Sequence, residues 1–427
     1  MRRRTPPGSR GAPIGTSNDG GGSRTASADH RAPKIRSVAS PATAAPLRGG
    51  GGTPYSRNVR SLLALDIALG PKLKEALRGC VDRGEAFCVL DQRLSPRRQN
   101  EALELLGATA VLDASGRVAR PGGRFVGDDV GVVMLTSGSS GVPKAAQLSW
   151  RALRASAQLT QATLRHGSPP AWYPCLPASH IGGLAVVLRA VLGDASLVWG
   201  DPDDLDAAAT LGATHVAVVR TQMVRHDLRG FATVLLGGGR PPANLPDNVV
   251  TTWGMTETGS GIVYNGLPLP GVDVGERNGE LVVRSPTLFD GYRDAERPTT
   301  VGPDGRADWF PTGDAGTVEN GRVRVRGRLE YVINTGGEKL WPEDLEVVLA
   351  TIDAVRDVAI TSVEDTEWGQ RVVALIVGDG TSLDDAIGAL AAERIGPWAK
   401  PKEIRYVAAI PRTTNGKIRR SELEHLF

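Results

Sequence analysis

This chain of 427 residues has few cysteines and no long apolar segment. Its three cysteines stand at scattered positions, without the pairing that a metal site or a disulfide framework needs. We therefore expect buried, reduced thiols in a cytoplasmic protein. No apolar run approaches the roughly 18 residues that span a bilayer, which excludes a transmembrane helix. The hydrophobic content of 41% is enough for a substantial core in two or three domains.

Acidic residues are scarce at the N-terminal end of the chain. Residues 1–53 hold nine Lys/Arg and two Asp, so the rest of the chain holds 41 basic and 45 acidic residues. The positive net charge belongs to this tail, and the remainder gives no reason to expect nucleic acid as a partner. The tail is rich in Gly, Pro, Ser, Ala and Arg and has almost no large apolar residues, so it cannot bury enough surface to fold. We predict a disordered basic extension over residues 1–54, with no role of its own.

Alternating β and α patterns follow the tail. A buried strand is predicted over residues 130–136, and Ser149 is expected to cap a helix that runs to Leu164. The alternation continues through strands at 196–199, 215–219 and 233–236 and helices at 205–211 and 221–228. This pattern predicts an α/β fold over residues 55–327, with mostly parallel sheets flanked by helices.

The pattern changes after residue 254 to short strands and turns, with β alternation at 279–284 and 322–326. Residues 328–427 are then predicted to form a compact α+β unit, and its length suits a small mobile lid domain. Its predicted elements are helices at 342–350 and 383–394 and from 416, and strands at 355–363, 371–377 and 403–408.

Two motifs nearly three hundred residues apart carry the strongest chemical signal. The first is Leu135-Thr136-Ser137-Gly138-Ser139-Ser140-Gly141-Val142-Pro143-Lys144. In such a loop, glycines let backbone N–H groups approach phosphates, hydroxyls donate hydrogen bonds, and Lys144 adds positive charge. It is not a Walker A loop, because no Gly-Lys-Ser/Thr ends it. The second is Pro411-Arg412-Thr413-Thr414-Asn415-Gly416-Lys417-Ile418-Arg419-Arg420, close to the C-terminus.

In this order and at this separation, the two motifs make the chain resemble the adenylate-forming enzymes. This superfamily includes acyl-CoA synthetases, aryl-acid ligases and the adenylation domains of peptide synthetases. The resemblance covers roughly residues 60–427. It implies an AMP-forming acid–thiol ligase that uses ATP, Mg²⁺ and coenzyme A on a small carboxylic acid. It also implies that the first motif holds the ATP phosphates, and that Lys417 stabilises the charge that builds on the α-phosphate during adenylation.

A third match is Thr251-Thr252-Trp253-Gly254-Met255-Thr256-Glu257-Thr258. The resemblance implies that Glu257 holds the metal, for which a carboxylate is a suitable hard ligand, and that Thr256 binds the α-phosphate. Trp253 stands before Gly254 where the family usually has Tyr, and it keeps a flat face for stacking on adenine. The opposite wall is expected to be Gly237-Gly238-Gly239.

Residues on both sides of the predicted domain boundary complete the nucleotide and thiol sites. Asp314, in Trp309-Phe310-Pro311-Thr312-Gly313-Asp314, matches the ribose-binding aspartate of the family, and Arg328 matches a second nucleotide contact. Glu330 would be the pivot of a domain rotation between the two half-reactions, although the family more often has Asp or Lys there. Gly336-Gly337 would line the tunnel for the pantetheine arm.

The acid is indicated by the segment Leu176-Pro177-Ala178-Ser179-His180-Ile181-Gly182-Gly183-Leu184 and by Arg189. In this region the chain resembles the bacterial o-succinylbenzoate–CoA ligases of menaquinone biosynthesis, including their short upstream part. That acid is a dicarboxylate, so Arg189 would bind the carboxylate that is not activated. His180 is expected at the reacting end, and Ser260 lies in a second stretch, 259–266, that resembles these ligases.

The sequence leaves several alternative functions open. The chain could use another acyl or aryl acid, or pass the acyl group to a carrier protein, or be an inactive relative that serves as a scaffold. Intact Lys417, Glu257 and Asp314 argue against the last of these. Single residues have plainer interpretations as well: His180 as a core or helix-capping histidine, and Arg189 as a surface arginine. A homodimer is one open form of assembly.

Lys417→Ala should reduce the adenylation rate on the order of a hundredfold or more, because the lysine charge acts only in the phosphoryl transition state. Thioester formation from a supplied acyl-adenylate should be spared. The two half-reactions are measured separately, and equal loss in both would contradict a lid that presents different residues in each step.

Overall fold

The computed structural model describes residues 59–136, 143–165, 167–242, 244–378, 383–412 and 418–427. The tail predicted over residues 1–54 lies outside these ranges, so its disorder stays a prediction. All three cysteines are buried and free, as expected. No helix within the described ranges is long and apolar enough to cross a membrane.

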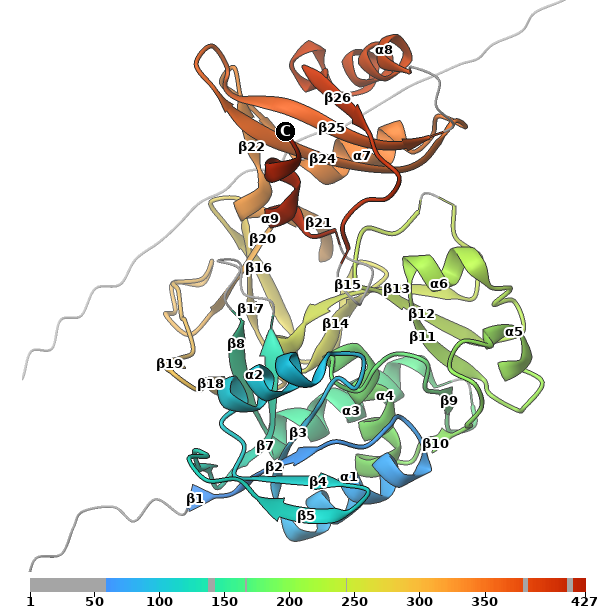
Figure 1. Cartoon of the computed structure of the whole chain (residues 1–427), viewed down its shortest axis with the longest axis vertical. Coiled ribbons are helices and arrows are strands. Elements are labelled where there is room, and N and C mark those ends of the chain that lie inside the picture. The colour runs from blue at the N-terminus through green and yellow to red at the C-terminus, as the bar shows by residue number, and fades with distance from the viewer. Residues whose placement is uncertain (1–58, 137–142, 166, 243, 379–382, 413–417) are drawn as a thin grey trace, which may run out of the picture. The chain divides into compact units, whose positions relative to one another are not determined.

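An eight-stranded sheet forms the first half of the large α/β part (Figure 1). In sheet order its strands are β19 (Ala295–Glu296), β18 (Gly291–Tyr292), β8 (Lys144–Ser149), β7 (Val130–Thr136), β3 (Ala86–Val89), β2 (Leu62–Leu65), β4 (Ala110–Asp113) and β5 (Gly116–Ala119). The central strands β7, β3, β2 and β4 run parallel, and the outer strands are added antiparallel. A separate small pair, β1 (Val59–Arg60) and β6 (Val126–Gly127), is antiparallel.

A seven-stranded sheet forms the second half. Its strands are β10 (Ser196–Leu197), β9 (Ala171–Tyr173), β11 (His215–Val219), β12 (Thr233–Gly237), β13 (Val249–Met255), β14 (Ser260–Tyr264) and β15 (Leu267–Pro268). The first five are parallel, and β14 and β15 turn back antiparallel. Both sheets therefore have the parallel core that the βα alternation predicts.

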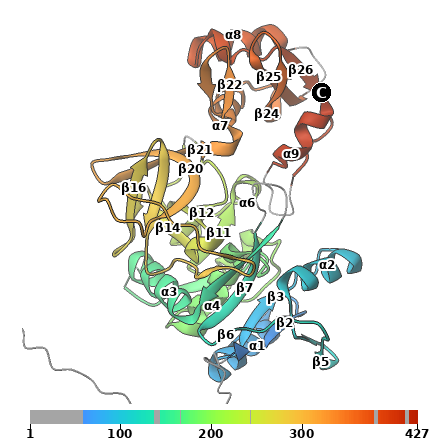
Figure 2. The same ribbon diagram turned by 90° about the vertical axis from the view of Figure 1, so that its left-hand side faces the viewer.

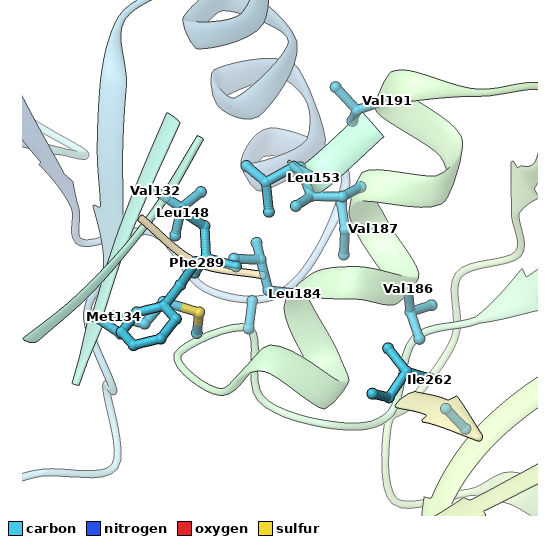
Figure 3. Close-up of a cluster of buried hydrophobic side chains, with 14 of the residues drawn as sticks. Val132, Met134, Leu148, Leu153, Leu184, Val186, Val187, Val191, Ile262 and Phe289 are labelled. Atoms are coloured by element: carbon cyan, nitrogen blue, oxygen red, sulfur yellow. The ribbon is translucent and has the colours of Figure 1, made fainter. Parts of the chain in front are cut away.

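The main hydrophobic core lies around helices that pack against both sheets. These helices are α1 (Pro71–Arg83), α3 (Trp150–Leu164) and α4 (Ile181–Leu192). Nine of the twelve residues of α4, from Gly183 to Val191, are buried, as in a helix that is covered on all sides over this stretch. Figure 3 shows Leu153 of α3 beside Val187 of α4, and Val186 near Ile262 of β14.

Further helices pack on the outer face of each sheet. Helix α2 (Pro96–Leu106) buries Leu103 and Leu106 against the eight-stranded sheet. Helices α5 (Leu205–Ala208) and α6 (Arg220–Arg225) lie over the other sheet. Strand β7 shows why both faces must be covered: Val132 belongs to the core between the sheets and Val133 to the outer core, as period-two alternation requires.

Short strands follow, as the sequence predicted. They form a four-stranded antiparallel sheet of β16 (Asp273–Arg277), β17 (Glu280–Arg284), β20 (Phe310–Glu319) and β21 (Arg322–Arg328). Short 3₁₀ turns, η1 (Thr256–Thr258) and η2 (Leu329–Tyr331), follow β13 and β21 respectively.

The C-terminal part is a small α+β unit (Figure 2). Its sheet contains β23 (Glu338–Leu340), β22 (Ile333–Thr335), β25 (Gly369–Gly378), β24 (Val355–Asp365) and β26 (Glu403–Tyr406). Helices α7 (Pro342–Leu349) and α8 (Asp384–Arg394) share one core with this sheet, which includes Ile376. The neighbouring Leu375 belongs to a second core with Leu423 of α9 (Arg420–Leu423). The remaining 3₁₀ turns are η3 (Pro397–Ala399) and η4 (Glu424–Leu426).

The predicted elements are largely confirmed, and most differences lie at their ends. Strand β7 and helix α3 have the predicted bounds, and the Ser149 side chain accepts a hydrogen bond from Ala152 N at 3.4 Å. The helix expected over 221–228 already ends at Arg225, because the backbone turns extended at His226. The last helix begins at Arg420, four residues later than predicted.

Candidate functional site

The predicted phosphate loop leaves the carboxyl end of β7 and returns along β8. Thr136 and Lys144 face each other across this hairpin, and the Thr136 hydroxyl donates to Lys144 O at 3.3 Å. Ser137, Gly138, Ser139, Ser140 and Gly141 lie outside the described residues, so their part in phosphate binding stays a prediction. The Lys144 ammonium lies 5.3 Å from the ring centre of Tyr292.

Tyr292 joins the phosphate loop to the expected metal ligand. It lies on β18, which pairs with β8, and its hydroxyl donates to Glu257 Oε1 at 3.0 Å. Burial and the adjacent Glu257 raise the pKa of Tyr292 well above its usual value, so the phenol stays a donor. The sequence prediction missed Tyr292, because a tyrosine on a two-residue strand has no periodicity that marks it.

Glu257 is held by a rigid turn. The Thr258 hydroxyl accepts from Met255 N at 2.8 Å and donates to Ser260 O at 2.7 Å, while Phe289 N donates to Glu257 O at 2.8 Å. Thr256 begins the same turn and is half-buried, as is Glu257. The described residues contain no cluster of three or more His, Cys, Asp or Glu side chains for a metal. One carboxylate oxygen is a suitable partner for Mg²⁺, which takes most of its ligands from water and phosphates.

Trp253, Asp314 and Arg328 form a connected group. The indole N–H of Trp253 donates to Asp314 Oδ2 at 2.7 Å, and Arg328 Nη1 donates to Asp314 Oδ1 at 3.1 Å and to Thr312 O at 2.8 Å. Asp314 is only 8% exposed. Trp253 lacks the phenol that the family usually has, yet it fixes the aspartate through its own N–H. Each carboxylate oxygen keeps a free lone pair for a further donor.

The glycines predicted around the base lie on neighbouring strands. Gly238 and Gly239 follow β12, which pairs with the strand β13 that carries Trp253. Gly254 is required by the close approach of β14, since a Cβ there would lie 2.2 Å from Ser260 O. No atom of the described residues lies within 4 Å of a Cβ built at Gly239, so the strand end presents its backbone without a covering side chain from these residues.

Arg189 is buried, which rules out its interpretation as a surface residue. It is only 2% exposed near the C-terminal end of α4, and its Nη2 lies 3.5 Å from Ser260 Oγ. Its Nη1 is buried without a hydrogen-bond partner, and no carboxylate in the described part of the chain pairs with it. Burial lowers the pKa of Arg189 from its ordinary value, although arginine stays charged. A small cavity between α3 and α4 is bounded by Arg189 and Gly259.

His180 lies at the other end of the same helix. It is the N-cap residue of α4, nine positions before Arg189, so the two are separated by about 13 Å along the axis. Its Nε2 lies 3.3 Å from Arg93 Nη2 and 3.6 Å from Asp91 Oδ2. Although burial opposes it, hydrogen bonds from Arg93 and the charges of Arg93 and His180 lower the pKa of Asp91. No motif in the sequence marks Asp91 or Arg93 as part of this site.

The residues predicted for the pivot and for the pantetheine tunnel lie in the C-terminal part. Arg328 Nε donates to the expected pivot Glu330 at 3.2 Å. Gly336 and Gly337 form the turn between β22 and β23 at positive φ, and Gly336 N donates to Trp368 O at 2.9 Å. A Cβ at Gly336 would lie 3.0 Å from the Trp368 ring, whereas Gly337 faces open space.

Lys417 lies outside the described residues, but the segments on both sides of it are anchored. Arg412 forms a hydrogen-bonded ion pair with Asp357 at 2.7 Å and a β-bridge with Ile418. The guanidinium of Arg420 is buried between Glu343 and Glu346 of α7, at 3.0 Å from each. These contacts hold the ends of the motif on the C-terminal unit.

Comparison with known proteins agrees with this geometry. The pattern described as AMP-binding enzyme matches residues 118–293, and that of the AMP-binding enzyme C-terminal domain matches residues 344–417. A Mycobacterium tuberculosis protein named probable 2-succinylbenzoate–CoA ligase is 34% identical over 341 residues, which cover 71% of this chain and 86% of the relative. The chain belongs to the AMP-binding enzyme family.

Two solved structures show the same fold of a large N-terminal and a small C-terminal domain. One is the Bacillus subtilis o-succinylbenzoate CoA synthetase in complex with its acyl-adenylate intermediate, with a TM-score of 0.73 and 24% identity over 85% of this chain and 88% of that one. The other is an Escherichia coli MenE variant with bound OSB-AMS, with a TM-score of 0.69 and 26% identity over 86% of this chain and 87% of that one. This family member is an AMP-forming acid–thiol ligase with an α/β fold.

Tyr292→Phe should raise the Mg²⁺ concentration needed for half-maximal adenylation by about three- to tenfold. The substitution keeps the ring but removes the hydrogen bond to Glu257, and such bonds contribute about 0.5–1.5 kcal/mol. A Mg²⁺ titration of pyrophosphate release measures the effect. Tyr173→Phe is the matched control, since Tyr173 is a buried tyrosine that donates to Asp201 O instead. Equal responses of the two variants would exclude a role for Tyr292 in orienting the metal ligand.

Proposed function

We propose that this chain is an ATP-dependent o-succinylbenzoate–CoA ligase that acts in menaquinone biosynthesis in the cytoplasm. One observation carries the choice of acid: the buried guanidinium of Arg189 has no carboxylate partner among the described residues. The relative and the two structures named above, which act on or bind this acid or its derivatives, support the same choice.

The first half-reaction joins the acid to AMP. A carboxylate oxygen attacks the α-phosphorus of ATP, the bond to the bridging oxygen breaks, and pyrophosphate leaves. When bound, Mg²⁺ neutralises charge on the phosphates, and Glu257 is the residue that we propose to hold it. Lys144 and Lys417 would add positive charge around the phosphates, where it stabilises the transition state more than the ground state.

The nucleotide would be held by the group around Asp314. Trp253 donates to one carboxylate oxygen and Arg328 to the other, so a ribose hydroxyl meets an acceptor that is already oriented. The base would lie between the Trp253 face and the backbone after β12, where no described residue lies within 4 Å of a Cβ position at Gly239. The same Trp253 ring would thus serve both the base and the ribose.

The second half-reaction transfers the acyl group to sulfur. The thiolate of coenzyme A attacks the acyl carbon, and AMP leaves with the electrons of the C–O bond. We propose residues 55–327 as the adenylating domain and 328–427 as the lid, with Glu330 as the pivot between them. The turn at Gly336 and Gly337 would admit the thin pantetheine arm, because no described residue lies within 4 Å of a Cβ position at Gly337.

The distal carboxylate of the acid would bind Arg189. A buried charge without a counter-ion destabilises the folded protein, so an anionic ligand at this position is favoured because it supplies that counter-ion. The planar guanidinium can present two N–H groups to one carboxylate, and no acidic side chain of the described ranges pairs with Nη1 or Nη2. Ser260 lies on the same side and offers a hydroxyl. We propose His180 for the reacting end, about 13 Å away along α4.

The test is acid-dependent pyrophosphate release with o-succinylbenzoate, benzoate, fatty acids and a monocarboxylic analogue that lacks the distal group. The o-succinylbenzoate ligase should turn over its own acid with the highest kcat/KM and transfer the product to coenzyme A. Preference for another acid, or transfer only to a carrier protein, would favour the other ligase alternative. An absence of ATP–pyrophosphate exchange with every acid would favour the inactive scaffold.

Arg189→Ala should raise the KM for o-succinylbenzoate by roughly ten- to a hundredfold, because a charge-assisted hydrogen bond contributes about 1.5–3 kcal/mol. The KM for ATP should change little. Arg189→Lys should restore only part of the loss, since an ammonium cannot make the planar two-toothed contact. Steady-state kinetics on the acid and on its monocarboxylic analogue measure the effect. If the variant and the wild type discriminate the two acids equally, Arg189 does not bind the distal carboxylate.

A further inference from the structure

Arg189 lies against the face of a second buried side chain, Trp172. The guanidinium carbon is 4.3 Å from the centre of the indole ring. Trp172 is 0% exposed and Arg189 is 2% exposed, so the pair is shielded from water. A cation over an aromatic face is most stabilising under these conditions.

The neighbouring strand fixes the ring. Trp172 on β9 is the register partner of His215 on β11, and the two rings lie 5.1 Å apart. His215 is itself held through both ring nitrogens, by Leu164 O at 2.9 Å and by the Thr214 hydroxyl at 2.8 Å. The Trp172 ring therefore cannot easily turn away from the arginine that α4 presents to it.

The contact with the ring leaves the N–H donors of the guanidinium available. An arginine has five such donors, and an aromatic ring beside the guanidinium carbon takes none of them in a conventional hydrogen bond. Among the residues that the structure describes, Nη1 has no partner and Nη2 meets Ser260 Oγ at 3.5 Å. A carboxylate of the protein in the same place would instead occupy the donors that a ligand needs.

We infer that Trp172 is a specificity-determining residue that holds Arg189 for acids with a second carboxylate. While no acid is bound, the ring offsets part of the cost of burying the positive charge. It leaves the N–H donors of Arg189 for the ligand. Selectivity for dicarboxylic over monocarboxylic acids then depends on an aromatic residue that is 0% exposed in the core. This inference rests on the proposed function, since it assigns Arg189 to the distal carboxylate.

The experiment compares Trp172→Phe and Trp172→Leu with wild type in the full chain. The readout is the ratio of kcat/KM for o-succinylbenzoate to kcat/KM for the monocarboxylic analogue. We expect this ratio to fall about fivefold with Phe, which keeps a weaker aromatic face, and about thirtyfold with Leu, which has none. The KM for ATP should stay near its wild-type value.

Trp150→Phe is the matched control. Trp150 is also a buried tryptophan of the same core, and its indole N–H likewise has no partner among the described residues. Its ring lies 5.9 Å from that of Phe87, at a tilted angle, and makes no cation–π contact within the described ranges. Loss of core packing alone would lower thermal stability in both Phe variants and leave the acid ratio of Trp150→Phe unchanged. An equal acid ratio in Trp172→Phe, Trp172→Leu and Trp150→Phe would overturn the inference.

A double variant separates the ring's action on Arg189 from a direct contact with the acid. In the Arg189→Met background, Trp172→Leu should change the ratio by less than half as much, on a logarithmic scale, as it does beside Arg189, because the cation over the ring is gone. Full additivity of the two changes would overturn the inference. Wild type that does not turn over o-succinylbenzoate would contradict the proposed function itself and remove the inference with it. Wild type with the expected preference but unchanged Trp172 variants would overturn the inference alone.

Discussion

The acid site depends on a buried positive charge, that of Arg189, which has no counter-ion in the part of the chain that the structure describes. Arg189 is carried into the interior by α4, a helix with nine of its twelve residues buried. Charges in such places are normally paired or lost during evolution, because desolvation costs several kcal/mol per ion. Here Trp172 and Ser260 stabilise the guanidinium only in part. The folded chain thus has an incomplete electrostatic pair that an anionic ligand completes.

In the nucleotide site, by contrast, the carboxylates already accept hydrogen bonds from protein side chains before any ligand binds. Asp314 accepts from Trp253 and Arg328, and Glu257 accepts from Tyr292. These contacts join β13, β18, β20 and β21, which belong to three different sheets. Pre-oriented carboxylates lose little entropy when they bind a ribose or a metal, which is how rigid strands support a reaction at loop ends.

Much of this arrangement could be predicted from the sequence, because the motifs stand at element ends. The strand before the phosphate loop, the Ser149 cap and the α+β character of the C-terminal unit are local patterns, and the structure confirms them. The burial of Arg189 was not predictable, because a single charged residue in a mostly apolar helix can face either the solvent or the core. Tyr292, Asp91 and Trp172 were missed because their roles arise from pairings between strands and loops distant in sequence.

A structure with a stable o-succinylbenzoyl-adenylate analogue tests the central claim most directly. We expect the distal carboxylate within hydrogen-bond distance of Arg189 Nη1 and Nη2, the indole of Trp172 still on the guanidinium face, and the ribose hydroxyls on Asp314. A carboxylate bound elsewhere, with Arg189 still meeting only Trp172 and Ser260, would contradict the account.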